Sequence, residues 1–288
     1  VHFGFIGRAE AKFVGGGDDL RELANPIAAN LDAMRPSLLP SLLMAAGRNQ
    51  SRGFKNLTLF EIGAQFQSGM PGAQQTVAAG IRVGDGERYW NESKSSLDVF
   101  AVKADMLAVL EATMGTPMTA PVKAGAPSWY HPGRSGTLAL GPKIIAYFGQ
   151  INPGTLAWFG LEFNLSPPVM AFEIFLDALP DGKSRKARAP FAPSPFQAIE
   201  RDFAFLVDAK VSGEEITRAA KSADRALIES VTIFDLYEGK GVGEGRKSLA
   251  IAVRIQPKDK TLTDAEIEAI AHKIIANVIK ATGATLRG

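Results

Sequence analysis

Apolar and polar positions alternate most regularly in the last third of the chain. Residues 249, 251, 253 and 255 are aliphatic and alternate with small or polar residues, which is the pattern of a strand with one buried face. Between residues 267 and 278, apolar side chains recur at three- and four-residue spacing, as on a helix that packs against an apolar surface. These patterns predict a strand and a helix that share one core.

Two helix starts in this region carry the same signature. Ser212-Gly-Glu-Glu215 and Thr263-Asp-Ala-Glu266 match the capping box, in which a hydroxyl and a carboxylate satisfy backbone N–H groups of the first turn. Strand-like runs lie at residues 203–207, 231–237, 249–255 and 284–287. The resulting β-α-β-β-α-β order predicts a ferredoxin-like sheet with both helices on one face and the other face uncovered.

The uncovered face is a candidate binding platform. Asp235 and Tyr237 share one strand face, because side chains alternate with period two. A carboxylate can accept hydrogen bonds from the N1 and N2 edge of an unpaired guanine, and a tyrosine ring can stack on a splayed base. An ordinary surface acid and a sheet aromatic would show the same spacing, so spacing alone leaves both interpretations open.

Two basic segments are candidates for phosphate contacts. The glycine-rich segment 239–245 is typical of a hairpin tip, and the side chains in or beside it are Lys240, Arg246 and Lys247. The second segment contributes Lys183, Arg185, Lys186 and Arg188, just before the proline-rich residues 190–195. Such runs are more often solvated linkers than phosphate sites, so both interpretations stay open.

The prolines, glycine and charges of residues 178–195 predict a domain boundary, since they continue neither a helix nor a central strand. We therefore expect a domain at 1–178, a linker at 179–195 and a domain at 196–288. The first domain has a predicted helix at 36–46, with Pro40 in its first turn, and a second helix capped by Asp98. Its strand-like runs are residues 57–66, 76–83, 137–140, 144–151 and 171–176.

Two other motifs resemble segments found in active sites, but we expect neither of them to be catalytic. Tyr130-His-Pro-Gly-Arg-Ser135 is expected to be a turn held by its own hydrogen bonds. The three glycines at 15–17 lack the lysine and hydroxyl of a phosphate-binding P-loop, so a plain loop is expected there.

Composition narrows the class of protein. The 288 residues are 46% hydrophobic and include no cysteine, which predicts two globular domains and excludes disulfides and thiolate metal sites. The three histidines are too scattered in the sequence for a metal cluster. No apolar run is long enough to cross a bilayer and no secretory signal opens the chain, so we expect a cytoplasmic protein with no membrane partner.

Separated motifs connect the chain to a known family. In the last third they are Phe196, Ile199-Glu-Arg201-Asp202, Phe234-Asp-Leu-Tyr-Glu-Gly239, Lys247-Ser-Leu249, Thr261-Leu-Thr263 and Leu286-Arg287. These resemble the anticodon-binding domain that ends the β subunit of bacterial phenylalanyl-tRNA synthetase. Upstream motifs resemble the synthetase-like core of that subunit: Leu23–Ile27, Met34–Pro40, Arg48-Asn49, Arg52-Gly53, Leu59–Gly63, His131–Ser135 and Gly149–Pro153.

The resemblance implies an α+β chain, with an antiparallel class II aminoacyl-tRNA synthetase-like core followed by a ferredoxin-like anticodon-binding domain. It implies a ligase that charges tRNA(Phe), in which this subunit joins the catalytic α subunit in an α2β2 heterotetramer. ATP and Mg²⁺ would be used by the α subunit, and no DNA partner is expected. The chain also resembles only the C-terminal portion of the subunit, so the oligonucleotide-binding-fold module and the editing domain would lie outside it.

The resemblance also implies roles for residues of the open face. Asp235 would accept from the first anticodon base, a guanine, and Tyr237 would stack on that base. Ser248 could hydrogen-bond an adjacent base, Ala204 would leave room for close approach, and Arg254 would meet a phosphate or a base face.

Catalysis by this chain alone is not expected. A class II site needs an arginine on its second-motif strand to hold the α-phosphate of ATP, and the matching residues Phe60-Glu-Ile-Gly63 include none. Residues 170–177 likewise lack the glycine-rich strand and the arginine of the third motif. We expect no cofactor on this chain and an exposed apolar surface on its first domain for the α subunit. The alternative is a regulatory module that binds a small molecule on a class II-like core.

Overall fold

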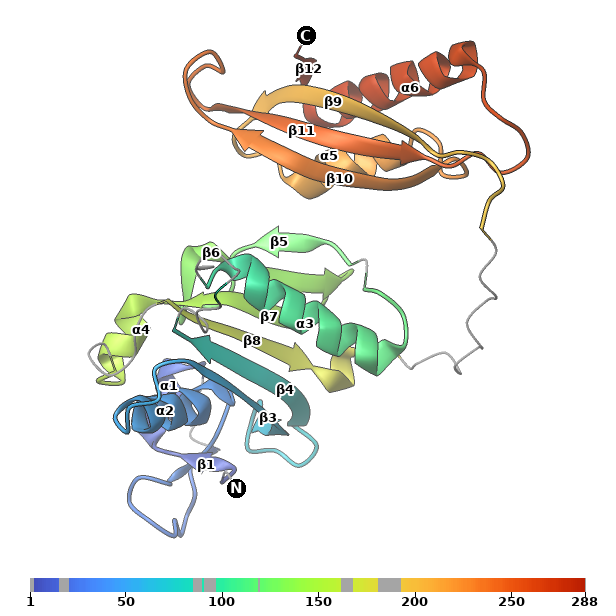
Figure 1. Cartoon of the computed structure of the whole chain (residues 1–288). Helices are drawn as coiled ribbons and strands as arrows, with labels where there is room; N and C mark the ends of the chain where they lie inside the picture. Colours follow the sequence, from blue (N-terminus) through green and yellow to red (C-terminus); the bar gives the residue numbers. More distant parts are fainter. Residues whose placement is uncertain are drawn as a thin grey trace. The chain divides into compact units, whose positions relative to one another are not determined.

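The computed structural model describes residues 3–15, 21–84, 90, 97–118, 120–161, 168–180 and 193–287. The chain divides into two compact units, Val1–Lys186 and Ala187–Gly288 (Figure 1). The basic run with Lys183, Arg185, Lys186 and Arg188 lies outside the described residues, as do Gly16 and Gly17.

The first unit is built on a six-stranded antiparallel sheet with the order β3-β4-β8-β7-β6-β5. The strands are β3 (Leu57–Phe66), β4 (Gln74–Val83), β5 (Val122–Ala124), β6 (Tyr130–Leu140), β7 (Lys143–Ile151) and β8 (Val169–Phe175). Every residue of β8 is buried, which explains why this central strand reads as a continuous run of mostly apolar residues rather than an alternating one.

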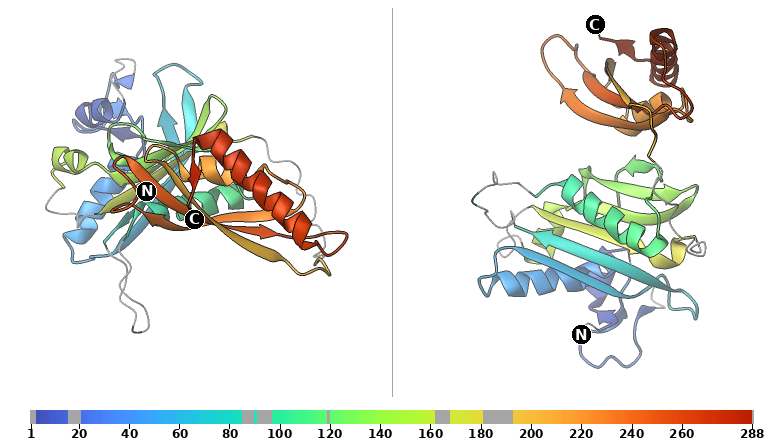
Figure 2. Two further views of the ribbon diagram at one scale, coloured as in Figure 1. Left: turned by 90° about the horizontal axis from the view of Figure 1, so that it is seen from above. Right: turned by 45° about the vertical axis from the view of Figure 1, so that its right-hand side comes forward.

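Helix α3 (Val99–Met114) lies along one face of this sheet (Figure 1, Figure 2). Asp98 caps it as predicted, since its carboxylate accepts a hydrogen bond of 2.9 Å from the Ala101 N–H. Helix α2 (Leu39–Gln50) carries Pro40 in its first turn, where a missing N–H costs nothing. The short elements of this unit are β1 (Phe5–Ile6), α1 (Arg8–Phe13), β2 (Ala33–Met34), α4 (Pro153–Trp158) and a 3₁₀ turn at Leu176–Ala178.

The expected turn at His131 to Ser135 is part of strand β6. Tyr130 pairs with Ile151 and Ser135 with Gly149, so β6 carries additional residues that bulge out of the ladder. The bulge is closed by its own hydrogen bonds, because the Gly133 N–H donates to His131 Nδ1 (3.1 Å) and Ser135 Oγ donates to the His131 carbonyl (2.7 Å). The motif is therefore a structural feature of the strand, and the strand predicted at 137–140 begins seven residues earlier.

The second unit has the predicted element order. It contains β9 (Ile199–Asp208), α5 (Gly213–Lys221), β10 (Ile228–Tyr237), β11 (Arg246–Ile255), α6 (Asp264–Thr282) and β12 (Thr285–Leu286). The antiparallel sheet has the order β10-β11-β9-β12. Side chains of α5 and α6 share one core with one face of this sheet, which leaves the opposite face open.

Both predicted capping boxes are present. Ser212 Oγ accepts from the Glu215 N–H (3.2 Å), and Thr263 Oγ1 accepts from the Glu266 N–H (3.3 Å). In return, Glu266 Oε2 accepts from the Thr263 N–H (2.9 Å), and Glu215 does the same for Ser212. The two helices therefore begin where the sequence predicted.

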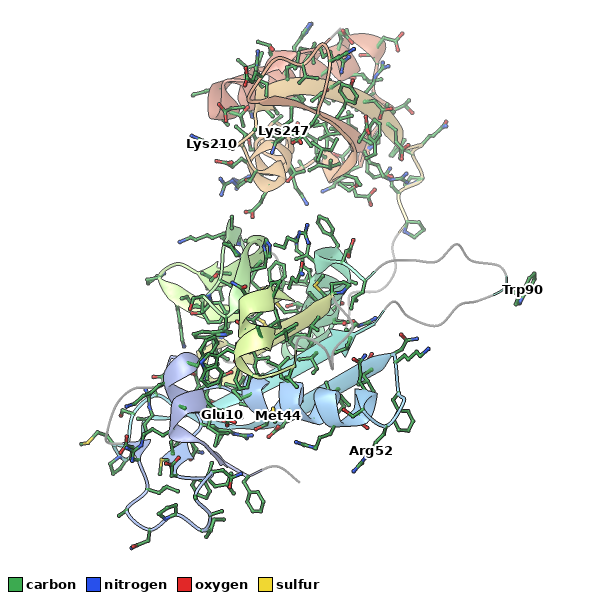
Figure 3. All side chains as sticks on the ribbon, turned by 90° about the vertical axis from the view of Figure 1, so that its left-hand side faces the viewer. Glu10, Met44, Arg52, Trp90, Lys210 and Lys247 are labelled. Atoms are coloured by element: carbon green, nitrogen blue, oxygen red, sulfur yellow. The ribbon has the colours of Figure 1, made fainter. Side chains whose placement is uncertain are left out.

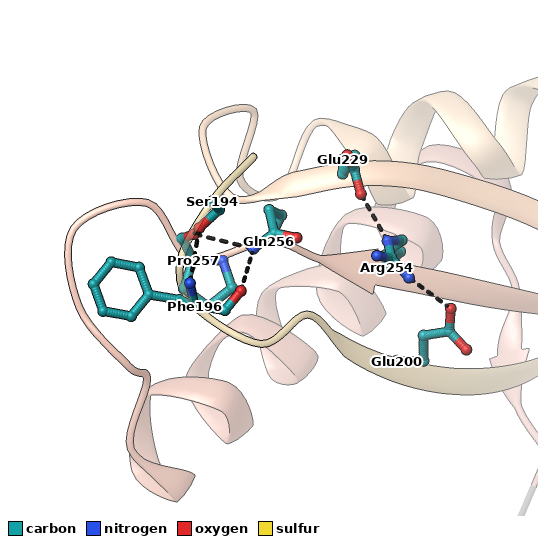
Figure 4. A network of polar contacts seen from close by, with 7 residues as sticks. All are labelled: Ser194, Phe196, Glu200, Glu229, Arg254, Gln256 and Pro257. Atoms are coloured by element: carbon teal, nitrogen blue, oxygen red, sulfur yellow. Dashed lines mark hydrogen bonds and ion pairs between the residues drawn. The ribbon is translucent and has the colours of Figure 1, made fainter. Parts of the chain in front are cut away.

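A small hydrogen-bond network fastens the start of the second unit to the end of β11 (Figure 4). The side-chain amide of Gln256 donates to the Phe196 carbonyl (2.9 Å), and Ser194 Oγ donates to the Pro257 carbonyl (2.8 Å). Ser194 Oγ also accepts from the Phe196 N–H (3.2 Å). The chain is therefore hydrogen-bonded to the rest of this unit already at Ser194, before β9 begins.

Candidate nucleic-acid interface

Strand pairing brings Asp235 and two alanines into one row on the open face of the second unit. Asp235 on β10 pairs with Ala250 on β11, which pairs with Ala204 on β9. Directly paired residues of antiparallel strands project from the same face. Asp235 is exposed and both alanines are half-buried, so a carboxylate stands beside two small side chains that leave the sheet accessible.

A bulge at Phe234 determines that Asp235 lies on the open face. Ile233 pairs with the buried Ile251 and packs into the core, and the pairing then shifts by one residue before Asp235. A regular strand would place Ile233 and Asp235 on the same face, because they are two residues apart. The extra residue therefore turns Asp235 away from the core.

The next row contains Tyr237, Ser248 and Leu206, which pair across β10, β11 and β9. Tyr237 is 42% exposed, and its hydroxyl donates to the Lys240 carbonyl (3.3 Å) in the loop that follows β10. Ser248 lies on the predicted face but is only 6% exposed. Tyr237 is thus available to a ligand, whereas Ser248 is not directly available in this structure.

Two arginines lie at this end of the open face. The guanidinium carbon of Arg287 is 5.9 Å from the centre of the Tyr237 ring, a cation–π distance. Arg246 donates to the Leu206 carbonyl (3.1 Å) and to Thr285 Oγ1 (3.4 Å). The approach of Arg287 to Tyr237 was not predicted, because Arg287 directly follows the outer strand β12, Tyr237 ends the other outer strand, and the two residues are far apart in sequence.

The opposite end of the open face is acidic. Arg254 Nε donates to Glu229 (2.7 Å), and its Nη1 lies 3.4 Å from Glu200 (Figure 4). The hydrogen bond to Glu229 raises the pKa of the Arg254 guanidinium above its ordinary value. Asp202 lies on the same face two residues along β9. Arg254 is therefore paired with two carboxylates of the same sheet, and the contact with a phosphate or a base face expected for it stays a prediction.

Lys247, which is labelled in Figure 3, belongs to the helix side of the sheet by its strand pairing. It pairs with the buried Val207, and its ammonium donates to the Ala209 carbonyl (2.8 Å). Hydrogen bonds from Ser212 lower the pKa of Glu215, and the charge of Lys247 contributes a smaller effect in the same direction. The expected basic cluster is thus divided, with Arg246 on the open face and Lys247 on the other.

The first unit exposes large apolar side chains. Phe60 and Ile62 on the edge strand β3 are 77% and 63% exposed, and Phe100 on α3 is 70% exposed. A groove of about 280 Å³ lies between these two elements, with Phe60, Val109 and Phe172 in its walls. An exposed apolar face of this kind is typical of a contact surface.

Among the described residues, no three histidine, aspartate or glutamate side chains lie close enough together to hold a metal ion. In the same part of the chain, no helix has the length and apolarity that a membrane span requires.

Two family models match the chain. The phenylalanyl tRNA synthetase beta chain CLM domain matches residues 1–176, and the ferredoxin-fold anticodon binding domain matches residues 194–287. The phenylalanine–tRNA ligase beta subunit of Paramagnetospirillum magneticum is 50% identical over 291 residues, and that of Rhodospirillum rubrum is 48% identical over 290 residues. The chain belongs to the phenylalanyl-tRNA synthetase beta-subunit family.

The resemblance inferred from separated motifs is therefore confirmed, and a regulatory module is not favoured. Each of the two alignments covers 100% of this chain and 36% of the relative, so the chain spans about a third of the beta subunits that it matches. Among solved structures, a pyrrolysyl tRNA synthetase of Desulfitobacterium hafniense aligns over 62% of this chain and 59% of its own, with 16% identity and a TM-score of 0.43. That likeness is too weak to support an argument.

Proposed function

We propose that this chain is the tRNA-recognition and assembly portion of a phenylalanyl-tRNA synthetase, acting in the ATP-dependent charging of tRNA(Phe). Its second unit binds the anticodon loop on the open sheet face. The observation that carries the proposal is the row of Asp235, Ala250 and Ala204 beside the exposed ring of Tyr237. The carboxylate of Asp235 can accept hydrogen bonds from a guanine, the Tyr237 ring can stack on a base, and the two alanines leave room for the bases to approach the sheet.

Phosphate contacts would come from the end of the face that holds Arg246 and Arg287, with Lys240 in the adjoining loop. A splayed base that stacks on Tyr237 would replace or join the guanidinium of Arg287 on the same ring. Ser248, which is buried, would meet a base only after the surface around it rearranges, and Arg254 would first have to leave its two carboxylates.

The first unit would serve as a class II synthetase-like core without catalysis of its own. We propose domains at 1–178 and 196–288 with a linker between them, and assembly of the first with the catalytic α subunit in a cytoplasmic α2β2 heterotetramer. The exposed Phe60, Ile62 and Phe100 support a contact surface on this unit. The α subunit would use ATP and Mg²⁺, because the strand with Phe60 lacks a phosphate-binding arginine.

The proposal is tested by titrating an anticodon stem-loop of tRNA(Phe) with the chain at fixed salt, followed by fluorescence anisotropy. Tyr237→Ala should weaken binding by about 1–3 kcal/mol, the usual contribution of one base stacked on an aromatic ring. Leu236→Ala is the matched control, because Leu236 is 56% exposed but pairs with the core residue Leu249 on the other face. Equal affinities of the two variants would remove Tyr237 from the interface.

Recognition of guanine by the Asp235 carboxylate is tested separately with Asp235→Asn. An amide replaces one acceptor oxygen with a donor, so the preference for guanine over adenine at the first anticodon position should fall. Stem-loops that differ only in that base are compared on parent and variant. An unchanged ratio of affinities would exclude Asp235 as the guanine acceptor.

A further inference from the structure

The outer strand β3 of the first unit has one open side. It forms an edge of the six-stranded sheet and pairs with β4 in a continuous register from Leu57 to Phe66 (Figure 1). In an antiparallel strand, the backbone N–H and C=O groups of successive residues point alternately to the two sides. Every second residue of β3 therefore directs its backbone groups away from β4.

Hydrogen bonds at the end of β3 show which residues these are. The Gln67 N–H donates to the Ala73 carbonyl on the β4 side (2.9 Å), whereas the Phe66 N–H donates to the Arg35 carbonyl (2.9 Å). The Ala64 carbonyl likewise accepts from Arg35 Nε (2.9 Å). The even-numbered residues therefore face outward, and Arg35 already occupies the edge at Ala64 and Phe66.

Thr58, Phe60 and Ile62 are the outward-facing residues that remain. Within the part of the chain that the structure describes, their outward N–H and C=O groups have no hydrogen-bond partner. Their side chains are exposed as well, by 77% for Phe60 and 63% for Ile62. Phe60 lies on the α3 face of the sheet, where it lines the groove that Val109 also lines. Open backbone positions and exposed apolar side chains thus coincide on residues 58–62.

This stretch lacks the features by which edge strands usually avoid pairing, which are lysine, proline, a bulge or a very short strand. β3 is ten residues long, contains neither lysine nor proline, and pairs with β4 without a bulge. Its one charged residue, Glu61, is bound by Arg35 Nη1 (2.7 Å), and the Glu61 side chain is only 11% exposed. Because Glu61 has the opposite parity to Phe60, no charged side chain of β3 lies among the exposed apolar ones.

We propose that a second copy of this chain pairs with β3, antiparallel and about a two-fold axis at Phe60. Thr58 then lies opposite Ile62 of the second copy, and Phe60 lies opposite Phe60. Each opposed pair exchanges two backbone hydrogen bonds, so the outward groups of residues 58–62 are all satisfied. The open stretch is symmetric about Phe60 and carries no charge that the same charge would oppose, as a self-complementary contact requires.

The pairing also covers apolar surface. Side chains of directly opposed residues lie on the same face of a sheet, so Phe60 and Ile62 of both copies gather on the α3 face of the joined sheets. The contact uses β3 and neither Phe100 of α3 nor the open face of the second unit. It is compatible with an α2β2 assembly, which would contain two copies of this chain.

The test is the oligomeric state of the 288-residue chain, measured by light scattering over a series of micromolar concentrations. The dimer fraction should rise with concentration, and backbone amide exchange of residues 57–63 should slow in parallel. A chain that stays monomeric throughout would overturn the proposal. Protection of residues 57–63 that appears only after a catalytic α subunit is added would also overturn it, because the edge would then belong to that subunit.

Two variants separate strand pairing from general apolar association. Thr58→Pro removes an outward N–H and keeps both apolar side chains, and proline is tolerated on an edge strand where the N–H faces solvent. Ile62→Lys introduces the residue that most often protects natural edges. Each variant should raise the dissociation constant of the dimer about tenfold or more, because the two-fold axis makes every loss occur twice.

Ile27→Lys is the matched control, because Ile27 is 70% exposed in the same unit and lies outside the strands. It should dimerise like the parent. Circular dichroism checks that each variant folds, and amide exchange of the parent decides the question by itself if neither edge variant does. Parent-like dimerisation of folded Thr58→Pro would refute strand pairing, and an equal loss in Ile27→Lys would refute the role of the β3 edge.

Discussion

Replacing Phe205 with alanine tests which face of the second sheet is the core. Phe205 is fully buried on the central strand β9, and its ring lies 6.3 Å from that of Phe203, with the two rings 21° from parallel. A buried Phe→Ala change costs about 3–5 kcal/mol, because both transfer free energy and packing are lost. Since a whole domain is stable by only roughly 5–15 kcal/mol, the second unit should lose a large part of its stability.

The assay is urea unfolding followed by two signals. Circular dichroism reports helices of both units, whereas all three tryptophans of the chain, at positions 90, 129 and 158, lie in the first unit. In Phe205→Ala, the second unit should unfold at a lower urea concentration, which appears as an earlier transition in circular dichroism. The tryptophan signal, which reports the first unit, should keep its midpoint, because the two units have separate cores.

Phe234→Ala is the control, since it makes the same chemical change on the same sheet. Phe234 is 56% exposed at the bulge of β10, so its replacement should change stability by only about 0.5 kcal/mol. If Phe234→Ala destabilised the chain as much as Phe205→Ala, or if the tryptophan transition moved equally, the assignment of core and open faces would be refuted.

Three further outcomes are expected. Thr263→Ala should lower the free energy of unfolding of the second unit, measured by urea titration, by about 1 kcal/mol, because the N-cap of α6 is lost. Thr263→Ser keeps the hydroxyl, so it should retain most of that stability. The hydrogen bond from Lys260, followed by those from Thr263, lowers the pKa of Glu266 from 4.5 to about 2. The ionised Glu266 carboxylate therefore stabilises the fold above pH 4.5, and this stabilisation is lost as the pH falls toward 2. Glu266→Gln should therefore reduce the loss of stability in that acidic range. Burial raises the pKa of Glu173 above 4.5. The protonated Glu173 side chain therefore stabilises the fold below pH 4.5, and this stabilisation is lost as the pH rises through the raised pKa. Glu173→Gln should reduce that loss, measured as the dependence of the urea unfolding midpoint on pH.

The helix starts and the element order of the second unit were predictable because their signals are local. A capping box lies within four residues, and Ser212 and Thr263 form theirs as the sequence predicted. The alternation of β11 likewise predicted its buried face, with Ile251 and Val253 fully buried. The short strands β1, β2 and β5 had no such signal, because elements of two or three residues are too short to show a period.

The face of Asp235 could not be derived from spacing. Spacing correctly placed Asp235 and Tyr237 on the same side of β10. It would also have placed both with Ile233 in the core, had the strand been regular. The bulge at Phe234 is defined by pairing with β11, and that register exists only in the folded sheet.

Sequence motifs were enough to place the chain in its family, to order the elements of the second unit and to supply the residue types that a tRNA interface would need. Which of those side chains are available follows from the folded sheet, because their partners lie on other strands. Arg254 meets Glu229 and Glu200 across the sheet, Arg287 approaches Tyr237 from the opposite edge of the same sheet, and Lys247 turns to the helix side. The charge and exposure of a sheet surface depend on strand register, and register joins residues that are far apart in sequence.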